Sequence, residues 1–168
     1  MTPEDIITAG NSLYQAEQSR IPCPLLSAAH PTATMDDAYA VQRAFVDRKL
    51  AEGRKIIGWK IGLTSRAMQQ QLNITTPDSG VLLDDMAFET GATIPPNRFI
   101  APRIEAEIAF VMKAPLTGDV TRDQVLAATD YVAPALEILD TRIIRAEGRK
   151  TRTIIDTISD NAANAGIV

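Results

Sequence analysis

The chain has 168 residues, of which 45% are hydrophobic, and a formal net charge of −4. This length suits one domain with its own core and is short for two. The absence of a Lys/Arg block argues against a nucleic acid partner. No apolar run reaches the about 20 residues of a bilayer span, and the N-terminus lacks the basic residues of a signal peptide. We therefore expect no membrane partner and a cytoplasmic location.

Cysteine and histidine occur once each, as Cys23 and His30. An intrachain disulfide and the zinc sites that draw on several such residues are therefore excluded. A bound metal would need oxygen ligands, which suit Mg²⁺, Mn²⁺ or Ca²⁺. His30 lies in a Pro-flanked polar stretch that is typical of a loop.

The first part of the chain is predicted to be helical. Residues 3–20 have apolar side chains at near-helical spacing and precede a Pro pair. Thr34, followed three residues later by Asp37, resembles a capping box and predicts a second helix that ends near Gly53. Residues 65–72 favour a third, short helix.

The rest of the chain is predicted to be rich in strands, because short apolar runs alternate with Gly, Pro and Asn. Residues 54–65 begin this part. The later predicted strands are GVLLDDM (80–86), ATIP (92–95), RIEAEIAFVM (103–112) and PALEILDTRI (134–143).

One helix interrupts the predicted strands. Thr121 and Gln124 form a plausible capping box for it, and we expect the helix to end around Val132. The basic segment 147–153 is predicted to be an exposed loop. We expect a single α+β domain over residues 1–168, with a helical part (1–55) and a β-rich part (56–168).

Two carboxylates share one face of the strand RIEAEIAFVM, since Glu105 and Glu107 alternate with apolar residues. Residues i and i+2 of a strand lie about 7 Å apart, which lets two Glu side chains converge on one ion. The same alternation also describes the solvated face of an antiparallel sheet, with Arg103 beside the two acids.

Glu137 is a third acid, and its neighbours in the sequence are aliphatic. A carboxylate in such surroundings needs a cation, a Lys or Arg partner, or a shifted pKa. Metal binding is one solution. A structural ion pair with Arg103 or Arg142 is the other.

Six strings in chain order resemble the 2-oxo acid hydratases of aromatic meta-cleavage pathways, in the fumarylacetoacetate-hydrolase-like group. The strings are GWKIGLTS, PDSG, LLDDM, PRIEAEIAFV, PALEILD and ISDNAANAG. The resemblance implies N-terminal helices followed by a mixed, barrel-like β core of the fumarylacetoacetase C-terminal-domain type. Members of the family continue past the position of Val168, so we expect part of that core to be absent here.

The resemblance also implies the site residues. It assigns Glu105, Glu107 and Glu137 to a bound Mg²⁺ or Mn²⁺. Lys60 would transfer a proton, and Asp78 would orient or deprotonate a water molecule.

Substrate contacts are implied as well. The same strings place Thr64 and Ser159 at the substrate. Ser79 stands where close relatives often carry an aromatic residue, which affects the finer substrate contacts.

The function that the resemblance implies is metal-dependent hydration of a small 2-oxo acid, with 2-oxohept-4-ene-1,7-dioate as the expected substrate. Decarboxylation of a 2-oxo-enedioate is an alternative, because the same metal chelate would stabilise the resulting enolate. An inactive binding module is a second alternative. We expect a homo-oligomer, which could also associate with a sister decarboxylase.

Overall fold

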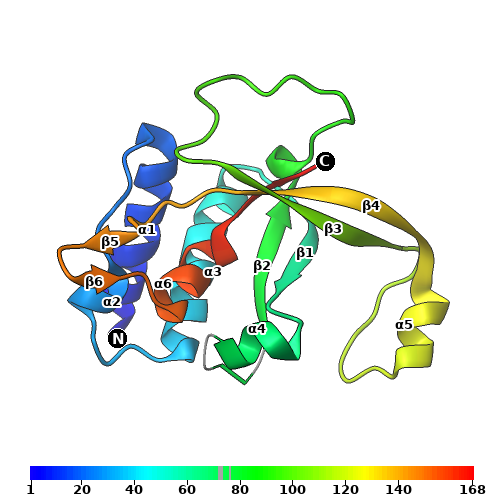
Figure 1. Ribbon diagram of the computed structural model, residues 1–168, viewed down its shortest axis with the longest axis horizontal. Helices are drawn as coiled ribbons and strands as arrows, with labels where there is room; N and C mark the ends of the chain where they lie inside the picture. Colours follow the sequence, from blue (N-terminus) through cyan, green and yellow to red (C-terminus); the bar gives the residue numbers. More distant parts are fainter. Residues whose placement is uncertain (72–73, 76) are drawn as a thin grey trace.

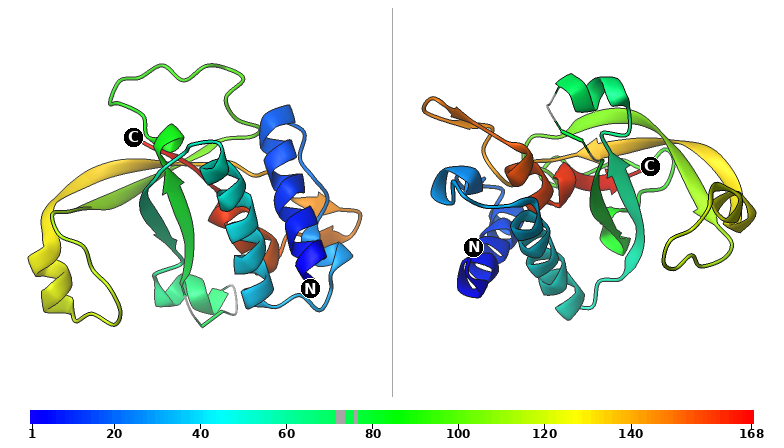
Figure 2. Two further views of the ribbon diagram at one scale, coloured as in Figure 1. Left: turned by 180° about the vertical axis from the view of Figure 1, so that it is seen from behind. Right: turned by 90° about the horizontal axis from the view of Figure 1, so that it is seen from below.

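A computed structural model of the chain describes residues 1–71, 74, 75 and 77–168. Helices α1 and α3 lie at one end of the molecule, and a long ribbon of two strands reaches away from them to α5 at the other end (Figure 1). A shorter ribbon, β1–β2, lies between the helices and the far end of the long ribbon (Figure 2).

Helices α1 (Pro3–Ser19) and α3 (Met35–Ala51) pack against each other, and the short α2 (Leu26–Ala29) lies between them in the chain. A Cβ on Gly10 would lie 2.7 Å from Cβ of Ala44, so the missing side chain permits the close approach of α1 and α3. Capping boxes begin both long helices. The two predicted N-terminal helices are confirmed.

Strands β1 (Ile56–Gly62) and β2 (Asp78–Leu83) form an antiparallel ribbon, and α4 (Arg66–Gln71) follows β1. The predicted short helix agrees with α4, except that its last residue, Leu72, lies outside the described residues. A 3₁₀ helix, η1 (Asp84–Met86), ends β2 earlier than the sequence suggested.

The second sheet carries the acids. Strands β3 (Arg103–Met112), β4 (Thr129–Leu139) and β7 (Asn164–Ile167) are antiparallel neighbours in that order. In the register of β3 and β4, Glu105 lies directly opposite Glu137.

The last part of the chain returns to the helices. Helix α6 (Ile154–Ser159) packs against α3, and the turn η2 (Asn161–Ala163) leads from it into β7. All three residues of η2 have φ between 52° and 58°, a left-handed conformation that is uncommon for residues other than Gly.

Two predicted boundaries on either side of β4 are wrong. Helix α5 (Arg122–Ala128) ends four residues before Val132, and β4 begins at once. Pairing with β3 decides this, because Tyr131 and Val132 lie opposite Val111 and Phe110. At its other end β4 stops at Leu139.

Two other predicted segments also differ. Residues 92–95 form no strand and belong to a long loop, where Pro95 and Pro96 lack the N–H groups of a ladder. Residues 147–153 are largely exposed, as expected, but they contribute to a small hairpin of β5 (Ala146–Glu147) and β6 (Lys150–Thr151). Gly148, with φ of 60°, makes its turn.

The core joins the helical part to β2 and to the segment after β4. Its buried members are Leu13, Leu25, Leu26, Val41, Phe45, Val46, Leu83, Met86 and Ile143. The α+β class is thus confirmed. Within the described residues the three sheets stay separate and do not close into a barrel. Every helix in that part of the chain is too short or too polar to cross a bilayer.

Candidate metal and proton-transfer site

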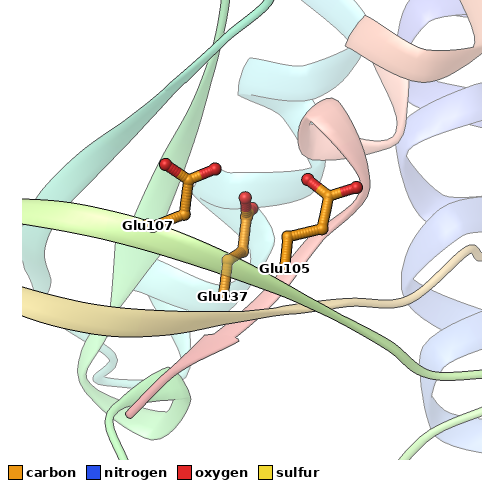
Figure 3. Close-up of side chains that lie close together, drawn as sticks. All are labelled: Glu105, Glu107 and Glu137. Carbon is orange, nitrogen blue, oxygen red and sulfur yellow. The ribbon is translucent and has the colours of Figure 1, made fainter.

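Three glutamates leave the β3–β4 ribbon on the same side (Figure 3). Glu105 and Glu107 come from β3, where the period of two places both on one face, and Glu137 comes from β4. One carboxylate oxygen from each lies within 4.8 Å of the others. This spacing lets all three acids contact one cation.

The electrostatics of this cluster favour a positive ion. Glu105 and Glu137 are directly opposite in the register, where two like charges destabilise a strand pair. Burial raises the pKa of Glu137, Lys60 opposes this effect, and the charges of Glu105 and Glu107 add to the increase. A divalent cation would relieve both the repulsion and the cost of burial.

Lys60 reaches this cluster from the other ribbon. Its Nζ lies 3.1 Å from Oε1 of Glu137, although the contact lacks hydrogen-bond geometry and Oε1 has no hydrogen-bond donor among the described residues. The structural partner of Glu137 is therefore Lys60. Arg142, one of the two partners considered from the sequence, is fully buried and pairs with Glu17 and Asp160 instead.

Asp78 is the next group in the site. It begins β2 opposite Gly62, is buried, and its Oδ1 has no hydrogen-bond partner among the described residues. A Cβ on Gly62 would lie 2.3 Å from that Oδ1 and 3.4 Å from Nζ of Lys60. The bare Cα of Gly62 therefore leaves the space in which Asp78 and Lys60 approach each other. Burial raises the pKa of Asp78, and the charge of Lys60 opposes that shift.

The two predicted substrate residues lie in different surroundings. Ser159 ends α6, has no exposed surface, and its Oγ has no hydrogen-bond partner within the described part of the chain. Thr64 is exposed just after β1. The structure brings Lys60, Asp78 and Glu137 together, whereas no described contact joins Thr64 to them.

Sequence reasoning missed two residues that shape this region, Gln42 and Gly62. Gln42 is buried on α3 and hydrogen bonds to the backbone beside Asp78 and beside Ser159. The signal was a polar residue on the apolar side of a predicted helix, since Gln42 lies between Val41 and Phe45.

The fold and the site define an α+β protein with a cluster of carboxylates suited to a hard divalent cation, in which Glu137 is paired with Lys60 and the buried Asp78 lies nearby. No protein-family model matches the chain.

The chain is similar to a 2-oxo-hept-4-ene-1,7-dioate hydratase of Escherichia coli, with 54% identity over 159 residues that cover 93% of the chain. It is 40% identical over 156 residues to a 2-hydroxypent-2,4-dienoate hydratase of Pseudomonas putida, of which it covers 68%. A solved structure of a Pseudomonas putida G7 4-oxalocrotonate decarboxylase, complexed with magnesium and adipate, superposes with a TM-score of 0.90 at 36% identity. That superposition covers 99% of this chain and 62% of the decarboxylase.

The chain belongs to the family of 2-oxo acid hydratases and 4-oxalocrotonate decarboxylases. It spans about 60% of the length of the Escherichia coli hydratase.

Proposed function

We propose that this chain carries the metal site of a Mg²⁺- or Mn²⁺-dependent hydratase. The reaction adds water to a 2-hydroxy-2,4-dienoate or 2-oxo-4-enoate and gives a 4-hydroxy-2-oxo acid in aromatic catabolism. The expected substrate is 2-oxohept-4-ene-1,7-dioate, in line with the name of the Escherichia coli relative. The observation that carries the proposal is the convergence of Glu105, Glu107 and Glu137, with Lys60 at 3.1 Å from Glu137.

The three glutamates are the proposed metal ligands. Their oxygens are hard donors, and the buried Oε1 of Glu137 has no hydrogen-bond donor among the residues that the structure describes. Three protein ligands leave coordination positions free for the carboxylate and 2-oxygen of a small 2-oxo acid. When bound, Mg²⁺ or Mn²⁺ would act as a Lewis acid and stabilise negative charge on the 2-oxygen of the substrate.

Lys60 and Asp78 are the proposed proton-transfer groups. Lys60 would move the proton of the 2-hydroxyl to the distal alkene carbon, so that the remaining double bond is conjugated to the 2-oxo group. Asp78 would orient or deprotonate a water molecule that adds its hydroxyl to carbon 4, while the proton goes to carbon 3. The raised pKa of Asp78 supports this role, because burial favours its protonated form and makes it a stronger base.

Ser159 and Thr64 are the proposed substrate contacts. The buried Oγ of Ser159 has no hydrogen-bond partner in the described part of the chain, and this supports the role, because such a group is costly unless something donates to it or accepts from it.

A second candidate function is decarboxylation of a 2-oxo-enedioate. The likeness to the 4-oxalocrotonate decarboxylase structure favours it, and the same chelate would stabilise the enolate left when CO₂ departs. A third reading is a chain that binds metal without turnover.

One experiment separates these functions. The chain is incubated with Mg²⁺ and 2-oxohept-4-ene-1,7-dioate, and separately with 4-oxalocrotonate, while absorbance of the unsaturated acid and CO₂ release are followed. If the chain is a hydratase, 2-oxohept-4-ene-1,7-dioate should be consumed without release of CO₂. A chelator or the Glu107→Gln substitution should abolish this consumption. Chelator-sensitive CO₂ release would favour the decarboxylase. Calorimetric binding of Mg²⁺ without any turnover would favour the binding module.

Further proposals concern the assembly and the fold. We propose that residues 1–168 act as one domain and that the β3–β4–β7 sheet forms part of a barrel-like core of the fumarylacetoacetase type. The exposed apolar face behind the glutamates supports this, since Ile104, Ile108 and Phe110 are 67%, 66% and 54% exposed. We also propose a homo-oligomer, with a sister decarboxylase as a further partner.

A further inference from the structure

Strand β2 carries Asp78, and among the described residues one of its two edges pairs with another strand. That edge pairs with β1. At the opposite edge, where no strand of the described residues pairs, the peptide groups of Ser79 and Val81 bond to side chains instead. Side chains from α3 and from the segment after α6 therefore take the place of a third strand.

Helix α3 holds the peptide groups of Ser79. The Ser79 N–H donates to the hydroxyl of Tyr39 at 3.2 Å, and Nε2 of Gln42 donates to the Ser79 carbonyl at 2.8 Å. The same Nε2 also donates to the carbonyl of Ile158 at 3.0 Å. One amide group thus ties the residue after Asp78 to the residue before Ser159.

The turn η2 holds the peptide groups of Val81. Oδ1 of Asn161 accepts from the Val81 N–H at 2.7 Å, and its Nδ2 donates to the Val81 carbonyl at 2.9 Å. Nδ2 of Asn164 donates to that carbonyl as well, at 2.9 Å. The position of β2 is therefore fixed two residues further along by a second set of side chains.

We propose that Gln42 is a positioning residue for the proposed reaction: its amide holds the segments that carry Asp78 and Ser159 at a fixed separation. This role rests on the proposed function of Asp78 and Ser159. Gln42 contacts neither the proposed metal ligands nor Lys60 in any described interaction.

The space around the Asp78 carboxylate is so tight that its approach to Lys60 depends on the position of β2. The clearance between Gly62 and Oδ1 of Asp78 is too small for one methyl group, so a shift of β2 by a fraction of an ångström changes the approach of Asp78 to Lys60. Gln42 is 7% exposed, so water does not readily replace its amide when the two carbonyls lose it. Misplacing a reacting group by about 1 Å can cost about a hundredfold in rate.

The test compares three variants in the chain with Mg²⁺ and 2-oxohept-4-ene-1,7-dioate. Gln42→Met keeps the side-chain volume and removes both hydrogen bonds. Val46→Ala, one turn along the same helix, removes buried apolar volume but no hydrogen bond, and serves as the control for lost stability. We expect kcat of Gln42→Met to fall about tenfold or more, with KM and Mn²⁺ affinity close to those of the unchanged chain. At a temperature where Val46→Ala stays folded, its kcat should equal that of the unchanged chain.

The third variant, Gln42→Glu, tests the hydrogen bonds themselves. The introduced carboxyl can donate one bond when protonated, and it repels both carbonyls when ionised. Its kcat relative to the unchanged chain should therefore rise as the pH falls. A Gln42→Met enzyme with unchanged kcat would overturn the proposal, and so would an equal loss of kcat in Val46→Ala.

A second measurement separates this proposal from the proposed function. Amide hydrogen exchange at Ser79 should accelerate about tenfold or more in Gln42→Met. In Val46→Ala the exchange rate at Ser79 should rise no more than the global loss of stability of that variant explains. If the unchanged chain turns over no substrate, the proposed function fails, and the exchange rates still decide whether Gln42 fixes β2. Equal exchange at Ser79 in the unchanged chain and Gln42→Met would overturn that placement.

Discussion

Lys60 on β1 reaches Glu137 on β4, with 3.1 Å between Nζ and Oε1, and this ion pair joins the two sheets that carry the site. Its partner Glu137 lies opposite Glu105 in the β3–β4 register. Among the described residues this ion pair engages one of the three carboxylates, so the cluster of Glu105, Glu107 and Glu137 keeps a net negative charge that suits a divalent cation.

Replacement of Glu107 by Gln should weaken Mn²⁺ binding by at least about tenfold, because one charged ligand is lost. Glu107 is exposed, so the free energy of unfolding without metal should change by no more than about 0.5 kcal/mol. Calorimetric titration with MnCl₂ and urea unfolding measure the two quantities. Glu147→Gln, in the exposed β5–β6 hairpin, is the matched control. Equal Mn²⁺ affinity in the two variants would contradict the metal site.

Replacement of Lys60 by Met should leave Mn²⁺ binding near normal and abolish ketonisation of the dienol, since the proton carrier is gone. The variant should also lose about 1–3 kcal/mol of stability without metal, because Glu137 keeps its burial but loses its cation. Saturating Mg²⁺ should add about the same stability to Lys60→Met as to the unchanged chain, because the affinity for the metal stays near normal. Thermal unfolding with and without Mg²⁺ checks the stability, and the decay of the dienol absorbance checks the chemistry. Normal ketonisation would remove Lys60 from the mechanism.

Replacement of Gly62 by Ala should displace the Asp78 carboxylate, because the new Cβ would lie 2.3 Å from its Oδ1. We expect a loss of about 1–3 kcal/mol in the free energy of unfolding and at least about a tenfold loss in kcat. Gly58→Ala on the same strand is the control, since its nearest atom would be Cδ1 of Leu82 at 3.6 Å, an ordinary contact. Equal free energies of unfolding in urea and equal kcat values for Gly62→Ala and Gly58→Ala would contradict this role of Gly62.

The stability of the chain should depend on pH through Glu17. Burial acts to raise the pKa of Glu17, but the cations Arg142 and Lys49 outweigh it and hold that pKa below its ordinary value of 4.5. A carboxyl whose pKa is lowered by folding stabilises the protein above its unfolded pKa, and this contribution disappears as the pH falls through the folded pKa.

Glu17→Gln should therefore lower the free energy of unfolding by about 1.5–3 kcal/mol at pH 7. The difference from the unchanged chain should shrink as the pH falls below 4.5. Urea midpoints measured between pH 3 and pH 7 give the comparison, and a difference independent of pH would show that the ion pairs do not act through the charge of Glu17.

Local signals in the sequence predicted the parts of the fold that depend on neighbouring residues. Thr34 and Asp37 form the predicted capping box, because those contacts span three residues. The boundary at Val132 was wrong, since the backbone there pairs with a strand about twenty residues earlier. Local propensity does not contain that pairing.

The candidate site was also predicted from the sequence only in part. The sequence alone determined that a metal would need oxygen ligands, and the period of a strand placed Glu105 and Glu107 on one face. Only the tertiary structure decided that Glu137 lies opposite Glu105, that Lys60 is its ion-pair partner, and that Gln42 joins the segments on which Asp78 and Ser159 lie. These contacts depend on strand register and on packing between elements distant in the sequence, and neither follows from the periodicity of a single segment.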